Sequence, residues 1–275
     1  MLNALKRINK KKFFKLSVEN NKFVRLNNYL IATQTNQIIG ELNNAIQYDI
    51  LAMNYLKPLR AMANRYYRIQ NININEIDSD GSNLPMTFKN MADDELREFE
   101  QWSEKKFGII FSIQKFEGHV SLIVKRKTGD SEKMNLADTG FGYSQMLPIV
   151  MSLWMIHKKN RISGMVKTII IEQPELHLHP AYQAKMIDVF VNIVSEAEKN
   201  NINIKVIFET HSETMINRLG TLISKGLIAP EKVNIIFFDK INNITKIKNK
   251  SFNDKGLLTE WPIDFFSAED DYNVD

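Results

Sequence analysis

The chain has 275 residues, of which 44% are hydrophobic and 25% are charged, so it can bury a sizeable core in one large or two small domains. Its 36 basic and 32 acidic side chains are mixed along the sequence, so the net charge of +4 gives DNA only weak support as a partner. The absence of cysteine excludes disulfide frameworks and thiolate metal sites, and no apolar run reaches the roughly 18 residues of a membrane span. These features predict a cytoplasmic protein that does not enter a membrane.

The amino-terminal part of the chain predicts a hairpin followed by a helix. FFKLSV and KFVRLN flank Glu19, Asn20 and Asn21, and their apolar residues roughly alternate around this turn-forming cluster. From Ile31 to Leu56, apolar residues recur about every fourth position, which is typical of an amphipathic helix. This apolar stripe comprises Ile38, Ile39, Leu42, Ile46, Ile50 and Leu51.

The middle of the chain predicts one helix and one further hairpin. The helix is expected from Ala92 to Lys106. The hairpin is expected to join Phe107–Phe116 to His119–Lys127 through a turn at Glu117 and Gly118, before a short strand that leads into Leu136.

The second half of the chain alternates between strands and helices, which predicts an α/β fold with a parallel sheet. The expected helices run over Tyr143–Lys158, Ala181–Lys199 and Glu213–Gly226, and the expected strands over Lys167–Ile171 and Lys205–Phe208. VNIIFFD and the run Thr245–Lys250 are expected to follow as further strands. Because ligands of parallel sheets bind where the strands end, functional residues are expected at the carboxyl edge of this sheet.

One stretch at that edge, TIIIEQPELHLHP from Thr168 to Pro180, is rich in polar side chains. A metal site is one interpretation, because His177 and His179 could act with Glu175 and the distant His211. No further histidine at ligand spacing completes such a set, and cysteine is absent. A solvated loop is the other simple interpretation, but it does not explain why a second apolar strand also ends in a polar motif, ETHSE.

Three motifs together resemble those of ABC-class ATPases of the SMC and overcoming-lysogenization-defect (OLD) type. IIIEQPELHLHP resembles their Walker B and D-loop segment, FETHSE their switch-histidine loop, and LADTGFGYSQMLPIV their signature segment. YLKPLRAMANRYY, GSNLP and GLLTEWPIDFF resemble segments of bacterial AAA-family proteins of this group, which are often associated with defence against phage. The resemblance implies a partial P-loop NTPase fold, ATP and Mg²⁺ as cofactors, and ATP-driven dimerisation that signals to an effector.

The resemblance also implies roles for individual residues. Glu172 stands where a carboxylate at the end of a strand would hold Mg²⁺, usually through water. His211 could reach a γ-phosphate oxygen or the attacking water from the neighbouring strand. The signature residues would bind the partner subunit's nucleotide at the start of a helix expected to begin near Gln145, and His179 would touch the dimer partner. The implied signature residues are Gly140, Gly142, Ser144 and Gln145.

The sequence departs from the family pattern at two points. Gln173 stands at the position of the catalytic glutamate, and an amide can orient water but cannot accept its proton, so slow or partner-dependent hydrolysis is expected, with Glu175 as a possible substitute base. No pair among the eleven glycines has the spacing of the phosphate-binding motif GxxxxGK[ST], Walker A. The chain thus resembles a member without its first lobe, and we expect an uncovered apolar face. If it nevertheless bound ATP tightly, Arg60 and Arg65 would be the first candidates to replace that motif.

These observations predict three regions and two alternative functions. Hairpins and a helical arm are expected in residues 1–137, the nucleotide-binding lobe in 138–250, and a tail in 251–275. The expected partners are a second copy of the chain, or a chain that supplies the Walker A lobe, and a separate effector nuclease, because the tail AEDDYNVD is too short for a nuclease domain. The alternative is a non-hydrolysing interaction module, or a decayed fragment, that uses the same dimer surface.

Overall fold

The chain divides into two compact units, residues 1–51 and residues 52–275. The computed structural model describes isolated helical residues between 29 and 47, and then residues 53–71, 74, 76–126, 132–158, 166–241 and 244–259. In the first unit, the described residues confirm the predicted helix, and the side chain of Thr35 donates a hydrogen bond to the Ile31 carbonyl one turn away, at 2.7 Å. The apolar stripe residues Ile38, Leu42 and Ile46 are exposed. The predicted hairpin around Glu19 lies outside the described residues.

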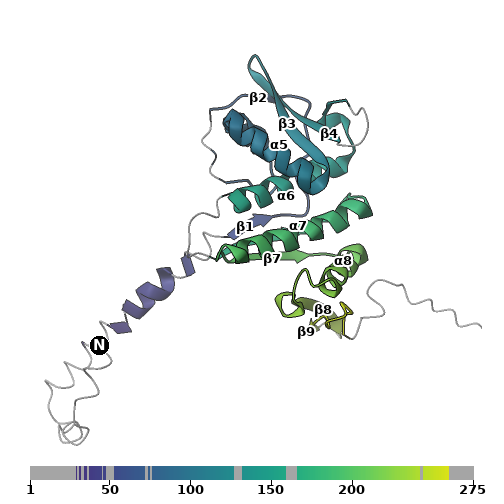
Figure 1. The fold of residues 1–275 in the computed structure, drawn as a ribbon. Helices are drawn as coiled ribbons and strands as arrows, with labels where there is room; N and C mark the ends of the chain where they lie inside the picture. The colour runs from purple at the N-terminus through teal and green to yellow at the C-terminus, as the bar shows by residue number, and fades with distance from the viewer. Residues whose placement is uncertain are drawn as a thin grey trace, which may run out of the picture. The chain divides into compact units, whose positions relative to one another are not determined.

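The second unit contains a parallel sheet, which confirms the predicted α/β fold (Figure 1). Its central strand β6 (Lys167–Glu172) lies between β1 (Met53–Leu56) and β7 (Ile204–Glu209), and both pairs are parallel. The prediction of a helix as far as Leu56 is wrong at its end, where β1 forms instead. Leu56 pairs with Ile171 in the ladder and is fully buried, so contacts with β6 override the helical periodicity of the local sequence.

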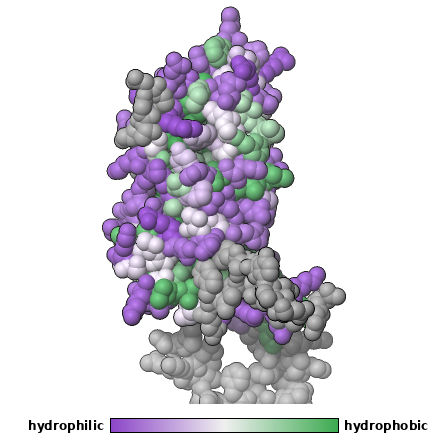
Figure 2. All heavy atoms as spheres, turned by 90° about the vertical axis from the view of Figure 1, so that its right-hand side faces the viewer, coloured by the Kyte–Doolittle hydropathy of each residue, from purple (hydrophilic) through white to green (hydrophobic). Residues whose placement is uncertain are grey.

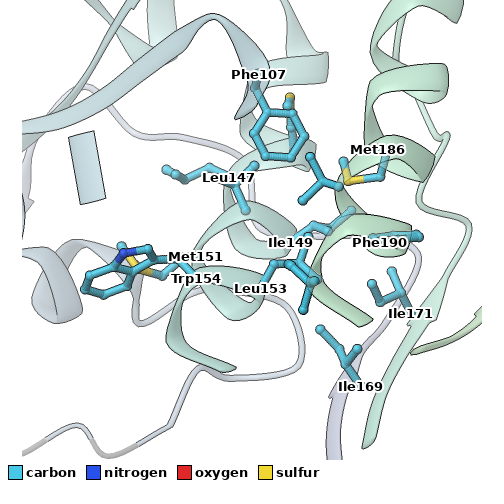
Figure 3. Close-up of a cluster of buried hydrophobic side chains, with 14 of the residues drawn as sticks. Phe107, Leu147, Ile149, Met151, Leu153, Trp154, Ile169, Ile171, Met186 and Phe190 are labelled. Atoms are coloured by element: carbon cyan, nitrogen blue, oxygen red, sulfur yellow. The ribbon is translucent and has the colours of Figure 1, made fainter. Parts of the chain in front are cut away.

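Three helices accompany this sheet. α6 (Phe141–Lys158) precedes β6, α7 (Pro180–Lys199) connects β6 to β7, and α8 (Glu213–Ser224) follows β7. α7 begins at a proline, whose missing N–H group costs nothing in the first turn of a helix. α6 is buried on most of its surface, as expected for a helix that is apolar on all sides. Figure 3 shows Ile149 and Leu153 of α6 beside Ile169 and Ile171 of β6 and Phe190 of α7, and all of them belong to one buried cluster.

The two faces of the parallel sheet differ in exposure. On one face, which we call the covered face, Leu56, Ile169 and Ile171 are fully buried, and Phe208 lies 5.4 Å from the ring of Phe190 of α7. On the other face, which we call the open face, the exposed fractions are 44% for Met53, 43% for Tyr55 and 53% for Ile207. Parallel sheets are usually covered on both faces, so the open face is unusual for this architecture.

A second, antiparallel sheet packs with two further helices. β3 (Ile109–Phe116) and β4 (His119–Arg126) form the predicted hairpin, and β2 (Tyr67–Arg68) and β5 (Met134–Asn135) also pair with β4. α5 (Asp93–Phe107) confirms the predicted second helix, whereas β2 and the short helix α4 (Leu84–Asn90) were not predicted. One buried core runs across residue 137, because Phe99, Phe111 and Leu136 belong to the same cluster as Leu147 and Ile169.

The last strands form a separate hairpin. β8 (Ile235–Ile241) and β9 (Ile244–Lys250) confirm the predicted strands, but they pair with each other in antiparallel fashion, and among the described residues they are not hydrogen-bonded to the parallel sheet. Hydrophilic residues predominate on the face drawn in Figure 2, with smaller hydrophobic groups between them. Within the described ranges, no helix combines the length and the apolar character that crossing a membrane requires.

Candidate functional site

Glu172 ends β6 at the carboxyl edge of the parallel sheet. The ladder places it opposite Glu209, the last residue of β7, so the loops after both strands begin at the same level. The hydroxyl of Tyr55 donates a hydrogen bond to Glu172 Oε1 at 2.9 Å. This hydrogen bond raises the pKa of Tyr55, with smaller contributions from partial burial and from the charges of Glu172 and Glu209. Tyr55 therefore orients one carboxylate oxygen of Glu172 and leaves the other for a ligand.

Gln173 follows Glu172 in a strained backbone conformation. Its φ of 44° lies in the left-handed region that residues with a Cβ rarely adopt. Its backbone N–H donates to the Glu209 carbonyl at 3.0 Å, and its carbonyl accepts from the Leu176 N–H at 3.2 Å. Such strain is characteristic of functional loops, and nothing in the local sequence predicted it, because glutamine is not a typical turn residue.

Glu175 joins the loop after β6 to the loop after β7. Its Oε1 accepts a hydrogen bond from the backbone N–H of His211 at 2.7 Å. Its Oε2 is buried and has no hydrogen-bond partner in the part of the chain that the structure describes. A buried carboxylate oxygen without a partner is costly, so the loop carries an unused acceptor at this position.

His211 is exposed, with 63% of its side chain accessible, and its Nε2 lies 3.7 Å from Glu209 Oε1. The residue after it, Ser212, caps α8: its hydroxyl accepts from the Met215 N–H at 3.1 Å and donates to Gln183 of α7 at 2.6 Å. These bonds fix the backbone on both sides of His211, while its ring remains at the surface. The predicted pair Glu172 and His211 therefore lies at the ends of adjacent strands.

His177 and His179 do not form a metal site with their neighbours. Nδ1 of His179 accepts a hydrogen bond from the Ala181 N–H at 3.2 Å and so caps α7. His177 has a φ of 61°, and its ring packs edge-on against Phe141 at 4.6 Å. No group of three histidine, aspartate or glutamate side chains in the described segments could hold a metal ion. The metal interpretation therefore receives no support from these residues.

The glycine-rich turn resembling the signature lies against the loop that follows β6. α6 begins at Phe141, so the prediction of a helix start near Gln145 is wrong, and of the proposed signature residues only Gly140 precedes the helix. A Cβ atom on Gly142 would lie 2.5 Å from the backbone oxygen of His177, which is too close for any other residue. Helix and loop therefore meet backbone to backbone.

The remaining two signature residues are buried in this structure. Ser144 is 7% exposed, and Gln145 is fully buried. The side-chain amide of Gln145 accepts from the backbone N–H of Arg60 and donates to its carbonyl, both at 3.0 Å. Both the oxygen and the nitrogen of its side-chain amide thus bond to the backbone of Arg60, and Gln145 holds this segment in place.

Arg60, named above as a candidate to replace the phosphate-binding motif, lies in the interior beside the end of β6, a position that the sequence did not predict. It is 3% exposed, and its Nη2 donates to the backbone oxygen of Glu172 at 2.7 Å. Burial lowers its pKa to about 10, and the charge of Glu175 partly opposes this change. Arg65 has a different place, because it pairs with Asp138 at the surface.

The residues present fit Mg²⁺ better than they fit a complete nucleotide. Magnesium in nucleotide sites is held by one or two carboxylates together with phosphate oxygens, and Glu172 offers an oriented carboxylate with one oxygen available. A phosphate cradle of the GxxxxGK type is absent from the 275 residues. A hollow of about 630 Å³ lies elsewhere, lined by residues between Asn64 and Met86, and contains none of the predicted site residues.

Comparison with solved structures finds SMC proteins at low identity. A protein from a study of ATP-driven dimerization and DNA-stimulated activation of SMC ATPases is 14% identical, with a TM-score of 0.38, over 60% of this chain and 86% of that one. The Smc head domain of Pyrococcus furiosus, bound to the C-terminal domain of ScpA, is 12% identical over 56% of this chain and 34% of its own, with a TM-score of 0.38. The Smc head domain of Pyrococcus yayanosii is 10% identical over 58% and 27%, with the same score.

Because these TM-scores are low, the fold of this chain is assigned from its own strands and helices. Among curated proteins, none matches. A match to a protein family covers more of the sequence, from residue 3 to residue 216, and includes the turn before α6, the end of β6 and the loop after β7. The chain belongs to the AAA ATPase domain family.

Proposed function

We propose that this chain is the part of an ABC-class ATPase, of the SMC-like and OLD-like type, that holds Mg²⁺ and positions water in an ATP-dependent dimer. One observation carries the proposal. β6 and β7 end in register, so Glu172, Gln173, Glu175 and His211 converge on one edge of the sheet. The carboxyl edge of a parallel sheet is the usual place for a ligand, and membership of an ATPase family supports a nucleotide as that ligand.

Each side chain has a role that fits its surroundings. Glu172 holds Mg²⁺ with the oxygen that Tyr55 leaves available. Gln173 orients the attacking water, and Glu175 takes a proton through Oε2, because its Oε1 is engaged by the backbone of His211. His211 contacts the γ-phosphate from its exposed position.

The turn before α6 contacts the nucleotide of the partner subunit in this proposal. Gly140 is exposed, and so the backbone near it can meet another chain. Ser144 and Gln145 are buried and support the turn from within. His179 lies at the exposed start of α7, where it can reach the partner while it caps the helix.

The phosphate cradle comes from a partner chain or from a lobe that these 275 residues do not contain. The open face of the parallel sheet supports this part of the proposal, because Met53, Tyr55 and Ile207 expose apolar surface where a second layer normally packs. The assembled dimer then reports ATP occupancy to an effector, which in phage defence would be a separate nuclease.

Phosphate release from a reconstituted protein tests the function. A homologous lobe that carries Walker A is co-expressed with the chain, and turnover is measured. Glu172→Gln should abolish turnover because it removes the charge that holds magnesium, and Gln173→Glu should raise it because a carboxylate accepts the proton of water. Glu231→Gln, an exposed carboxylate in the short 3-10 helix η2 (Pro230–Lys232), serves as the control and should change nothing.

Mixed dimers test whether the site is shared between subunits. Ser144→Arg should disable the turn that faces the partner, and Glu172→Gln should disable the carboxylate edge of its own chain. A heterodimer of these two variants keeps one of its two sites intact. It should therefore recover about half of the activity of the unmodified dimer. Absence of both phosphate release and nucleotide-dependent dimers in sedimentation would leave the fold and remove the ATPase function.

A second candidate function is a non-hydrolysing interaction module. The open face favours it as well, because this surface can bind a partner without nucleotide. The two functions differ in one measurement: the module binds its partner equally with and without ATP.

A further inference from the structure

Arg60 lies between the start of α6 and the carboxyl end of β6, and the function proposed above assigns it no role. It follows β1 by four residues, in a segment that is fixed by backbone hydrogen bonds from Lys57 to Ser79 at 2.9 Å and from Ala61 to Asp80 at 2.8 Å. The backbone of this segment therefore holds a defined position, and the side chain of Arg60 starts from a fixed point.

Two elements are joined through this residue. On one side, Gln145 in the first turns of α6 pairs with both the N–H and the carbonyl of Arg60, at 3.0 Å each. On the other side, the guanidinium donates to the backbone oxygen of Glu172 at 2.7 Å. Of the three residues, Gln145 and Arg60 are buried and Glu172 is not. Water therefore does not compete for the hydrogen bonds that these buried side chains make.

A buried arginine is not the side chain that would make the fold most stable at position 60. Nε and Nη1 of Arg60 are buried without hydrogen-bond partners in the described part of the chain. Burial disfavours the charged form and lowers the pKa of Arg60 to about 10. An apolar side chain of similar length would avoid both costs, since a buried charge is worth keeping only for the specific geometry that it imposes. Local costs of this kind occur at functional positions.

We propose that Arg60 is a positioning residue that makes the start of α6 and the carboxyl end of β6 move together. The inference rests on the function proposed above and deepens it. In that dimer the turn before α6 meets the partner's nucleotide, whereas Glu172 serves the nucleotide of its own chain. The link Gln145–Arg60–Glu172 therefore couples the two composite sites through the interior of each subunit.

Hydrogen exchange on the chain alone tests the link without nucleotide. The reporters are the amides of Leu176 and Leu178, which donate within the loop after β6, the amide of Gln173, which donates to the Glu209 carbonyl of β7, and the amide of His211, which donates to the Glu175 carboxylate. Gln145→Met and Arg60→Met should each accelerate exchange at these amides by about tenfold or more, because Arg60→Met removes the hydrogen bond from the charged guanidinium to Glu172, and Gln145→Met removes the two amide hydrogen bonds that hold the Arg60 backbone. Arg65→Met, which removes the exposed arginine that pairs with Asp138, is the matched control and should leave them unchanged.

Two further measurements separate positioning from general packing. Arg60→Met removes buried unpaired donors, so its thermal midpoint should stay equal or rise while the reporter amides exchange faster. Arg60→Lys keeps one charged donor and should restore part of the protection. Unchanged exchange at the reporters in both Met variants, or faster exchange spread evenly over the chain with a lower midpoint, would overturn the link. Failure of the reconstituted ATPase would leave these exchange results intact, so the two proposals fail separately.

Discussion

The two faces of the parallel sheet are built by the same three strands but have opposite surroundings. On the covered face, Leu56, Ile169 and Ile171 belong to one buried cluster with side chains of α6 and α7 and have no exposed surface, whereas on the open face Tyr55 and Ile207 expose close to half of their area. Alternation along each strand sends neighbouring residues to opposite sides, so a chain can complete one face and leave the other for a partner. The difference in exposure distinguishes residues that stabilise the fold from residues that are available to a partner.

The largest expected effect is the loss of a large side chain from the covered face. Ile171→Ala should lower the free energy of unfolding by about 2–5 kcal/mol, since it leaves a cavity among buried neighbours. Ile207→Ala, on the adjacent strand and the open face, should cost less than about 1 kcal/mol. Urea unfolding measures both. Equal losses would show that the open face is covered in solution by a part of the chain outside the described residues.

Association of the chain depends on the open face. Because the face is apolar, we expect self-association that increases with concentration, and Ile207→Lys should weaken it about tenfold to hundredfold. Phe238→Lys, at an exposed position of the β8–β9 hairpin, is the control for general stickiness and should have a smaller effect. Analytical ultracentrifugation gives the constants. A monomer at all concentrations would contradict the idea that this face needs a partner.

Tyr182 of α7 and Tyr55 of the open face both have a raised pKa, so the helix layer and the open face can be compared by pH. Burial, followed by the hydrogen bond with Tyr143, raises the pKa of Tyr182 on α7 to about 12. The folded chain thus holds this proton more tightly than the unfolded chain, and the resulting stability is present below pH of about 10 and lost as pH rises toward 12. Tyr182→Phe should remove this part of the alkaline loss in urea midpoints, and Tyr55→Phe should remove less. An identical alkaline slope in Tyr182→Phe and the unmodified chain would refute the assignment.

The smallest expected effect on stability is at Gln173, which follows β6 at the carboxyl edge of the sheet. Gln173→Gly should raise the free energy of unfolding by roughly 0.5 kcal/mol, because relief of the left-handed strain slightly exceeds the entropy that glycine adds to the unfolded chain. Asn201→Gly, at a similar φ of 56°, should gain less, since asparagine tolerates this region. Calorimetry resolves the order of the two variants, and a loss of stability in Gln173→Gly would mean that its side chain makes a stabilising contact.

Periodicity and strand ends predicted much of the fold and part of the site. The hairpin of β3 and β4, the helices α5 to α8 and the strands β6 and β7 follow from local patterns, and the meeting of Glu172 with the loop of His211 follows from two parallel strands that end together. β1 was missed because its apolar residues also fit a helix, and only its ladder with β6 decides between them.

The missed parts of the site depend on contacts between distant residues. Gln145 and Arg60 are 85 positions apart, so neither local sequence indicates that the amide of one holds the backbone of the other. The hydrogen bond between Glu175 and the His211 backbone joins residues 36 positions apart, and it depends on the parallel pairing of β6 with β7. Such pairs follow from tertiary packing, which local propensity does not encode.

The close contact between Gly142 and the His177 backbone limits how related sequences can diverge at this position. Because the backbone of His177 lies where a side chain would begin, natural selection for folding alone retains glycine at this position. A descendant that no longer used nucleotide would keep this glycine and continue to look like an ATPase in that segment. Substitutions at Glu172 and His211, which are not buried, would instead accumulate freely after such a loss. Under the proposed function, these two positions are therefore the ones that would record in related chains whether the activity has been kept.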